Sequence, residues 1–371
     1  MGGAPVLEHE PALCALIERV QQARATRGTL CIRGGGTKDF YGDAPRGEPL
    51  DMTALCGISS YEPTELVVTV RAGTPLADLE AALAEQGQCL AFEPPRFAAG
   101  GTVGGMVAAG LSGPSRAAVG SVRDHVLGAT LLNGKGEVLS FGGQVMKNVA
   151  GYDVSRVLAG SMGVLGAICE VSLKVLPRPA ATATLRFEMD QAKAIRQLNE
   201  WAGRPLPLRA SAWWQGLLVL RLAGAAAAVD TAAYVLGGEL VPAELAAGFW
   251  EGLRDHTDEY FVAARAAVEQ GATLWRLSLP QVATPLALAG DSLVEWGGAQ
   301  RWLVSTQPAA EVRDAAAAAG GHATLFRGRD RSAGVFAPLK SPLDRIHREL
   351  KRAFDPDGVF NLGRMYPGLC P

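Results

Sequence analysis

The chain has 371 residues, a formal net charge of −2 and 48% hydrophobic residues. This length predicts two domains, and the apolar content is sufficient for a core in each. The absence of a basic excess argues against nucleic-acid binding, because such proteins gain much of their affinity by neutralising phosphates.

The six cysteines are scattered, and no two form a C-x-x-C pair, so neither zinc nor an iron–sulfur cluster is indicated. Such cysteines suit a reducing compartment. The N-terminus lacks the basic and apolar pattern of a signal peptide, and the best apolar run, 217–229, is interrupted by Arg221. We therefore expect a cytoplasmic protein without a transmembrane segment, or one held at the inner membrane through partner subunits.

The first predicted elements lead into a glycine loop. Apolar spacing predicts a helix over 11–25, and a short buried strand over 29–32 follows it. That strand runs into Arg33-Gly34-Gly35-Gly36-Thr37-Lys38, where successive N–H groups and a hydroxyl could cradle a diphosphate. The alternative is an ordinary glycine turn. Neither G-x-G-x-x-G nor a P-loop is present, so the site is not of the Rossmann type.

A second glycine-rich stretch spans 93–113 and is called here the central glycine segment. It follows a predicted strand at 65–71 and a predicted helix from Thr74-Pro75 to Gln86. Six glycines make the segment a poor helix and a poor strand, but they leave backbone N–H groups open to a ligand. The alternative is a flexible linker, although such linkers are usually richer in serine.

A third glycine segment covers 148–166, after a predicted hairpin of 126–132 and 137–141 that turns at Asn133-Gly134. The strand 167–175 then ends near Pro177 and Pro179, which mark the first domain boundary. We expect all three glycine segments to form the walls of one cofactor site in a domain of residues 1–178.

In the second half of the chain, the sequence predicts a smaller α/β domain over 179–340 and a C-terminal part over 341–371. All seven tryptophans lie between Trp201 and Trp302. Core filling is one role for them and a docking surface the alternative. Strands are expected at 182–187, 210–222 (a pair), 273–279 and 301–305, and helices at 191–201, 223–236, 311–319 and 343–354.

These motifs together resemble the vanillyl-alcohol oxidase superfamily of FAD-binding proteins. The similarity rests on a P-x-x-x-x-G-G-T-V-G-G segment followed by N-x-A-G-Y-D and G-S-x-G-x-L-G segments, in that order after the first loop. The tail from Asp355 to Pro367 is similar to the ending of the D-lactate and glycolate dehydrogenase branch, with Leu362 in place of the usual proline. The phrases PPRF, GQVMKNVAGYDVSRVLAGS and NLGRMYP resemble those of the E subunits of bacterial glycolate oxidases.

The resemblance implies an α+β fold, in which a two-part FAD-binding domain of the PCMH type precedes a cap and a tail that returns to the first domain. It also implies which residues bind FAD. The first loop would hold the diphosphate, the central glycine segment would line the flavin, and the third glycine segment would complete the site. The implied cofactor residues are Arg33, Gly34, Gly35, Gly36, Thr37, Pro94, Gly101, Thr102, Gly104, Gly105, Ala108, Gly113, Arg123, Asp124, Asn148, Gly160, Ser161, Gly163, Gly166, Ile168, Asn361 and Arg364.

The FAD is expected to be non-covalent, because no histidine lies between Arg33 and Lys38 to tether it. Catalytic members of the branch carry a G-D-G-N-x-H segment and paired metal-binding histidines, and this sequence has neither. His125 is interpreted as a structural histidine, with a catalytic base as the alternative. We therefore name no catalytic residue and no metal ligand.

Three functions follow as hypotheses. The first is an FAD-binding subunit of a glycolate oxidase complex, which would work with a larger homologous FAD subunit and an iron–sulfur subunit on a small 2-hydroxy acid. The second is a stand-alone D-2-hydroxy-acid dehydrogenase with an unusual base. The third is a non-catalytic assembly subunit without flavin.

Overall fold

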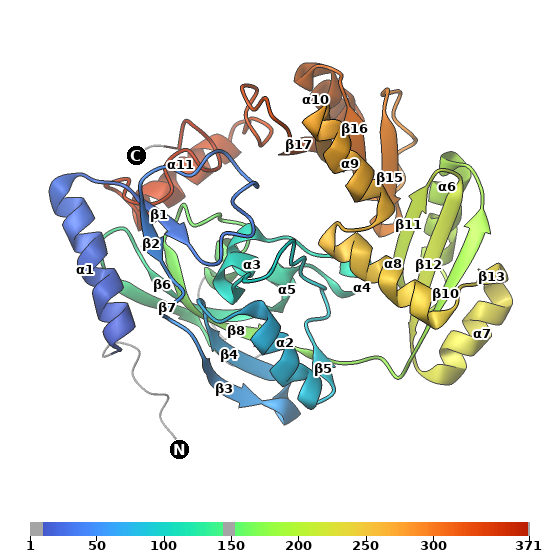
Figure 1. Cartoon of the computed structure of the whole chain (residues 1–371), viewed down its shortest axis with the longest axis horizontal. Coiled ribbons are helices and arrows are strands. Elements are labelled where there is room, and N and C mark those ends of the chain that lie inside the picture. The colour runs from blue at the N-terminus through green and yellow to red at the C-terminus, as the bar shows by residue number, and fades with distance from the viewer. Residues whose placement is uncertain (1–9, 144–152, 370–371) are drawn as a thin grey trace.

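The computed structural model describes residues 10–143 and 153–369, and these form two lobes that lie side by side (Figure 1). The first lobe is built on a five-stranded antiparallel sheet and the second on an eight-stranded antiparallel sheet. Helices pack around both, so the predicted α+β class is confirmed. The first lobe continues to Pro177 and the second begins with a strand at Ala181, close to the two prolines noted in the sequence.

The five-stranded sheet of the first lobe has β6 and β8 near its centre. All seven residues of β6 are buried, since this strand has neighbours on both sides and is covered on both faces. Two short pairs flank the sheet, one parallel (β1–β2) and one antiparallel (β5–β9). The strands are β1 (Leu30–Arg33), β2 (Glu48–Asp51), β3 (Ile58–Glu62), β4 (Val67–Arg71), β5 (Gln88–Cys89), β6 (Val126–Leu132), β7 (Val138–Gly142), β8 (Ala167–Lys174) and β9 (Leu176–Pro177), and the sheet order is β3-β4-β8-β6-β7.

The helices of the first lobe follow the apolar spacing of the sequence. In α2, Leu76, Leu79 and Leu83 are buried at helical spacing. This helix begins one residue later than predicted, because the Thr74 hydroxyl donates to the Arg71 carbonyl at 2.7 Å and does not cap the helix. The helices are α1 (Pro11–Thr26), α2 (Leu76–Glu85), α3 (Val103–Ala109), α4 (Arg116–Val119) and α5 (Val122–His125).

The β6–β7 hairpin exists, but its turn differs from the predicted two-residue turn. The loop runs from Asn133 to Glu137, and the positive φ falls on Gly136. The Asn133 side-chain oxygen accepts hydrogen bonds from the N–H groups of Lys135 and Glu137, both at 2.9 Å. An Asx turn therefore fixes the loop in place of the expected Asn-Gly turn.

The second lobe has its helices packed on the eight-stranded sheet. Five tryptophans (Trp201, Trp250, Trp275, Trp296 and Trp302) are buried, so core filling is their main role. The helices α8 and α9 and the strands β15 and β17 were not predicted. The strands are β10 (Ala181–Glu188), β11 (Leu208–Trp214), β12 (Leu217–Gly224), β13 (Glu239–Leu240), β14 (Thr273–Ser278), β15 (Asp291–Glu295), β16 (Gln300–Ser305) and β17 (His322–Arg327), in the order β13-β10-β12-β11-β15-β16-β14-β17; the helices are α6 (Gln191–Ala202), α7 (Ala226–Leu236), α8 (Ala243–Asp255), α9 (Glu259–Glu269) and α10 (Ala309–Ala318).

The C-terminal part returns to the first lobe, where α11 (Leu343–Phe354) lies near β1 in Figure 1. A bridge pairs Leu30 with Phe360. The buried Lys351 ammonium donates to Asp355 and to the Val164 and Phe360 carbonyls. None of the helices within residues 10–143 and 153–369 has the length and apolarity needed to cross a bilayer.

Candidate functional site

A narrow cavity, called here the glycine cavity, lies in the first lobe where the first loop, α3 and the third glycine segment meet. Its empty volume, part of which is open to solvent, is about 420 Å³, and its walls are mostly backbone and small side chains. Predicted cofactor residues that line it are Gly34, Thr102, Gly104, Gly105, Ala108, Gly163, Gly166, Ile168 and Asn361.

The central glycine segment contains a helix, contrary to the expectation of an irregular stretch. Thr102 caps α3 by accepting a hydrogen bond from the Gly105 N–H at 3.2 Å, and Met106 and Val107 are fully buried beneath it. The cap and the burial of these side chains offset a glycine cost of about 1 kcal/mol per residue. The glycine face of this short helix is therefore held rigidly at the cavity.

The first loop presents backbone donors beside this helix. The N–H groups of Gly35 and Gly36 donate to no other group in the described part of the chain. A Cβ on Gly35 would lie 1.6 Å from the Gly100 carbonyl oxygen, so the loop and the central glycine segment interlock at this point. Arg33 pairs with Asp39 at 2.8 Å. Free amides next to a cation are the donors that a diphosphate requires.

The third glycine segment is tied to α3 by two backbone hydrogen bonds. The Gly160 N–H donates to the Val107 carbonyl at 3.0 Å, and the Met162 N–H donates to the Ala108 carbonyl at 2.9 Å. Ser161 is buried within the same turn. A Cβ on Gly110 would come within 2.7 Å of the Gly160 Cα, so this close approach of two backbones requires glycine.

The C-terminal tail holds two of these walls together. The Asn361 side chain accepts from the Ile32 N–H at 2.8 Å and donates to the Met162 carbonyl at 2.7 Å. Arg364 donates to the carbonyls of Lys38, Asp39 and Asp43, and its burial lowers the pKa of its guanidinium. Both residues were predicted to reach a ligand; in the structure their side chains bind the loops that form the cavity, and Asn361 also lines it.

Gly105 shows how well the cavity suits a cofactor that approaches the main chain. A Cβ built on Gly105 would meet only the Thr102 hydroxyl, at 3.1 Å, and would otherwise project into open space. The same atom on Gly104 would lie 2.6 Å from the Ala72 Cβ, inside the packed core. The two neighbouring glycines therefore have different roles. Gly105 leaves open space at the cavity, whereas Gly104 permits close packing against Ala72. The residues present fit FAD, with free amides for the diphosphate and open backbone for a flat ring.

The remaining predicted residues lie at different distances from the cavity. Thr37 and Gly101 lie next to each other, with a Cβ on Gly101 lying 3.3 Å from the Thr37 hydroxyl, and neither lines the cavity. Pro94 is buried in the loop that leads toward the second lobe, and Gly113 lines the interlobe space described below. Arg123 and Asp124 are exposed on α5, where Asp124 accepts hydrogen bonds from the Ser121 N–H and hydroxyl. Asn148 lies outside the described residues.

Sequence reasoning missed four residues that line the glycine cavity: Ile32, Met52, Ala72 and Met162. Ile32 is the third residue of β1, and Ala72 directly follows β4. Met162 stands inside the G-S-x-G segment, so its position in that motif was a usable signal. Met52 follows β2, a strand that was not predicted, and no motif marks it.

A second, smaller space lies between the lobes, next to the end of the central glycine segment, and is called here the interlobe acid site. It is lined by Gly113, His256, Arg276, Glu295 and Gln300, among others. The buried Glu295 accepts hydrogen bonds from Gln300 at 2.9 Å and from the indole of Trp302 at 2.6 Å. Burial raises the pKa of Glu295 to about 7 despite these hydrogen bonds. The carboxyl group can therefore carry a proton near neutral pH.

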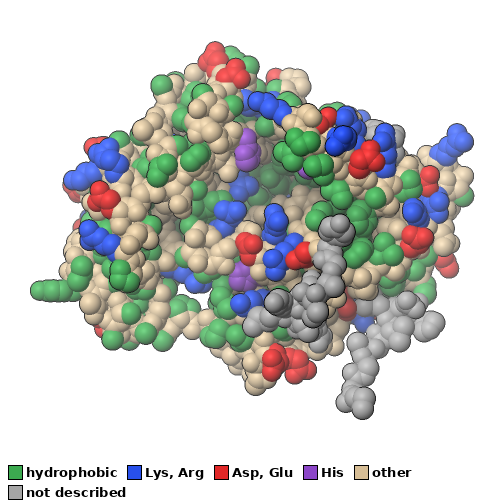
Figure 2. Space-filling view, turned by 180° about the vertical axis from the view of Figure 1, so that it is seen from behind, with side chains coloured by type: hydrophobic (Ala, Val, Ile, Leu, Met, Phe, Trp, Pro, Cys, Tyr) green, Lys and Arg blue, Asp and Glu red, His purple; other side chains and the backbone are tan. Residues whose placement is uncertain are grey.

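Burial also lowers the pKa of two ionisable groups near the interlobe acid site. Burial lowers the pKa of Lys38 to about 8, and its ammonium lies 5.7 Å from the centre of the Phe97 ring. Burial also lowers the pKa of His256, which stacks on Phe261 with ring centroids 3.6 Å apart. Figure 2 shows the hollow between the lobes from behind, with lysine, arginine and histidine side chains gathered around it.

The other histidines in the described part of the chain do not cluster with metal-binding side chains. Both ring nitrogens of buried His125 contact backbone carbonyls, those of Lys174 at 3.2 Å and Val119 at 3.1 Å, which supports its interpretation as a structural residue. Among residues 10–143 and 153–369, no three histidine, cysteine or acidic side chains gather as a metal site would require.

Comparison with known proteins agrees with this geometry. Residues 13–142 match the FAD binding domain family, so the chain carries an FAD-binding domain. In fold, the chain is similar to alkyldihydroxyacetonephosphate synthase, with a TM-score of 0.60 and 16% identity over 93% of this chain and 74% of that one.

Individual related proteins identify the family to which the chain belongs. It is 31% identical to glycolate oxidase subunit GlcD of Bacillus subtilis over 173 residues, which cover 46% of this chain and 37% of that protein. It is 47% identical to glycolate oxidase subunit GlcE of Escherichia coli over 355 residues, which cover 96% of this chain and 97% of that protein. The chain therefore belongs to the family of glycolate oxidase subunit GlcE.

Proposed function

We propose that the chain is the smaller FAD-binding subunit of a glycolate oxidase, and that a larger homologous FAD subunit carries out the hydride chemistry. An iron–sulfur subunit would take the electrons onward, and any attachment to a membrane would pass through these partners. The observation that carries this proposal is the near full-length similarity to GlcE, together with a cavity that fits FAD.

When bound, FAD would supply the redox chemistry of the subunit, and the residues of the chain would hold it without a covalent bond. The amides of Gly35 and Gly36 would donate to the diphosphate, and Arg33 would add positive charge. The open face at Gly105 would allow a flat ring to lie against the backbone. Asn361 and Arg364 would act as positioning residues, because they fix the loops and leave the ligand to the main chain.

A stand-alone dehydrogenase of D-2-hydroxy acids is the second candidate, and the interlobe acid site favours it. Arg276 could bind a carboxylate, and Glu295 could accept the hydroxyl proton, since a general base works best with a pKa near the operating pH. In the structure, Arg276 donates a hydrogen bond to Gln300 at 2.6 Å, and Gln300 donates one to Glu295. A substrate would therefore have to displace part of this hydrogen-bond network.

Turnover of glycolate with a dye acceptor distinguishes the candidates. The proposal expects the purified, flavin-loaded chain to be inactive alone and to increase the turnover of the larger subunit when the two are combined. Activity of the chain alone that is lost in Glu295→Gln would establish the second candidate. A chain that assembles with its partners but takes up no flavin would instead be an assembly subunit.

The mode of attachment is tested separately by acid precipitation. We expect all the flavin to remain in the supernatant. Flavin that stays with the precipitated chain would show a covalent bond and contradict this part of the proposal.

A further inference from the structure

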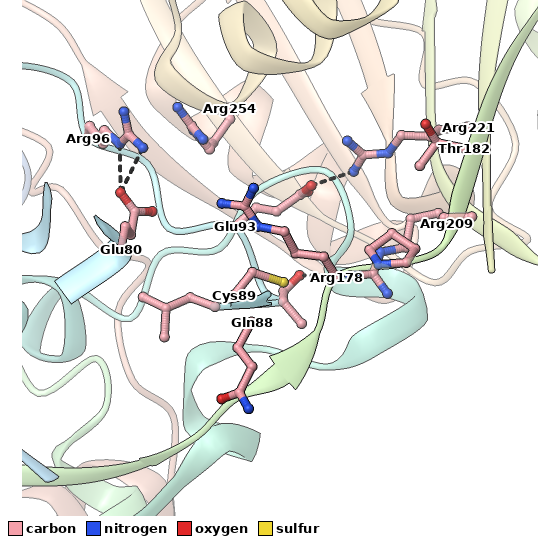
Figure 3. A pocket seen from close by; sticks show the side chains of 14 residues that line it. Glu80, Gln88, Cys89, Glu93, Arg96, Arg178, Thr182, Arg209, Arg221 and Arg254 are labelled. Carbon is pink, nitrogen blue, oxygen red and sulfur yellow. Dashed lines mark hydrogen bonds and ion pairs between the residues drawn. The ribbon is translucent and has the colours of Figure 1, made fainter. Parts of the chain in front are cut away.

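Five arginines converge on a cavity between the two lobes, which shares Arg254 with the wall of the interlobe acid site (Figure 3). The cavity, called here the arginine cavity, has an empty volume of about 780 Å³, part of which is open to solvent. Its arginines come from distant parts of the chain. Arg96 belongs to the first lobe, and Arg178 belongs to the segment that leads out of this lobe. The second lobe contributes Arg209 from β11, Arg221 from β12 and Arg254 from α8.

The carboxylates that line this cavity do not balance its positive charge. Among the described residues, Glu80 and Glu93 are the only carboxylates that line it with the five arginines. Glu80 pairs with Arg96 at 2.7 Å, and Glu93 pairs with Arg221 at 2.6 Å; both pairs are drawn in Figure 3. Arg254 pairs with Asp255 at 2.6 Å and with Glu251 at 3.0 Å, and neither of these carboxylates lines the cavity. A structural ion-pair network would match cations with anions, whereas this one keeps an excess of cations.

Arg209 and Arg178 carry the excess. Arg209 donates to the Ser115 hydroxyl at 3.0 Å and to the Ala91 carbonyl at 3.5 Å, and no carboxylate lies within 4.0 Å of it in the described part of the chain. Burial is the largest influence on the pKa of Arg209 and lowers it; the charge of Glu93 raises this pKa, and the charge of Arg221 lowers it. The Arg178 side chain is exposed at the cavity and makes no ion pair with any described residue.

Like charges held in a half-buried space repel one another, and this repulsion grows as solvent is excluded. An anion with two or more oxygen-bearing groups would relieve it, because guanidinium groups bind carboxylates and phosphates through paired hydrogen bonds. The arginines surround a concave space and do not form a flat patch, so the geometry suits a small ligand that they can enclose.

We propose that the arginine cavity binds a small multivalent oxyanion, either a di- or tricarboxylate or a phosphate compound. The ligand would bridge the lobes, since the side chains that hold it come from both. The cavity is connected along the chain to the central glycine segment, because Glu93 stands at the start of that segment and Ser115, which binds Arg209 and Arg221, lies just after its end. This proposal does not depend on the redox role of the chain.

Isothermal titration of the full-length chain with citrate and, separately, with inorganic phosphate tests the proposal, with sodium chloride at matched ionic strength as the reference. We expect saturable binding of at least one probe at millimolar concentration or below, and a higher melting temperature with that probe. Preference for citrate would assign a polycarboxylate, and preference for phosphate a phosphate compound.

The variants Arg209→Gln and Arg178→Gln locate the site. We expect each to weaken binding about tenfold, because each removes a guanidinium that forms no ion pair with a carboxylate in the described part of the chain. The matched control is Arg329→Gln, which removes an exposed arginine paired with Glu269 and should leave affinity unchanged. Arg178 is exposed, so its variant remains informative if Arg209→Gln is unstable.

Absence of saturable binding by either probe would overturn the proposal. So would equal loss of affinity in all three variants, which would show a general charge effect, or an equal rise in melting temperature with chloride alone.

Discussion

The glycine cavity and the arginine cavity are built in opposite ways. The first is walled mostly by backbone and small side chains, and the amides of Gly35 and Gly36, next to its Gly34 wall, donate to no other described group. The second is walled by long charged side chains that meet from both lobes. A backbone site has a shape fixed by the fold, whereas a side-chain site depends on distant residues being brought together. This difference decides which substitutions should abolish function and which should only weaken it.

The largest effect is expected from Gly105→Val, which fills the glycine cavity without touching the core. We expect the variant to fold and to retain no flavin, because the new side chain occupies the space of the ligand. The ratio of flavin to protein absorbance and the circular dichroism spectrum measure the two properties. The matched variant Gly104→Val should instead lose stability, by about 1–3 kcal/mol or more, since its Cβ enters the core. A fully loaded Gly105→Val protein would show that the ligand lies elsewhere.

Lys351→Met tests the support behind the glycine cavity. Lys351 and Asp355 are almost completely buried, so the variant leaves a buried carboxylate without its cation. We expect a loss of about 3–5 kcal/mol in the free energy of unfolding, measured by urea denaturation. The control is Arg352→Met, which removes one partner of an exposed pair with Glu349 and should cost less than about 1 kcal/mol. Equal stability of the two variants would contradict a supporting role for the buried pair.

The pH dependence of stability tests the interlobe acid site. Burial raises the pKa of Glu295 to about 7 in the folded chain, above its value in the unfolded chain. The unfolded chain therefore releases this proton first, and stability falls as pH rises between about 4.5 and 7. Glu295→Gln mimics the protonated form, so its advantage over the native chain should grow across that window, to about 3 kcal/mol. A constant difference between the two proteins from pH 5 to pH 8 would show that Glu295 is ionised throughout.

Arg364→Met should have the smallest effect, because Arg364 supports the loop of the glycine cavity and is expected to make no contact with the cofactor. The variant loses the hydrogen bonds to the Lys38, Asp39 and Asp43 carbonyls. We expect the dissociation constant of FAD to rise about tenfold, as measured by flavin fluorescence. Arg348→Met, in an exposed pair with Asp344, is the control and should bind FAD normally. Complete loss of FAD from Arg364→Met would indicate direct contact with the cofactor.

The difference between a backbone site and a side-chain site also explains which of the two cavities could be predicted from the sequence. The glycine segments are local patterns with fixed spacing, so Gly34, Gly105 and Gly163 could be assigned to one site before the structure was known. The helix α3 was missed because glycine propensity disfavours it, while the Thr102 cap and the burial of Met106 stabilise it.

The arginine cavity could not be predicted from local patterns. Arg209 and Arg221 meet because β11 and β12 pair in one particular register, which places Ala210 opposite Arg221. Arg254 arrives on α8, a helix that was not predicted. No spacing in the sequence encodes the packing of the two lobes, and that packing brings these side chains to the loop that carries Glu93.

The most direct test of the central claim is the absorption spectrum of the chain purified alone, recorded before and after adding glycolate without oxygen. The account predicts an oxidised flavin spectrum that glycolate leaves unchanged until the larger subunit is added. A flavin that glycolate bleaches in the isolated chain would contradict it and assign the hydride chemistry to this chain.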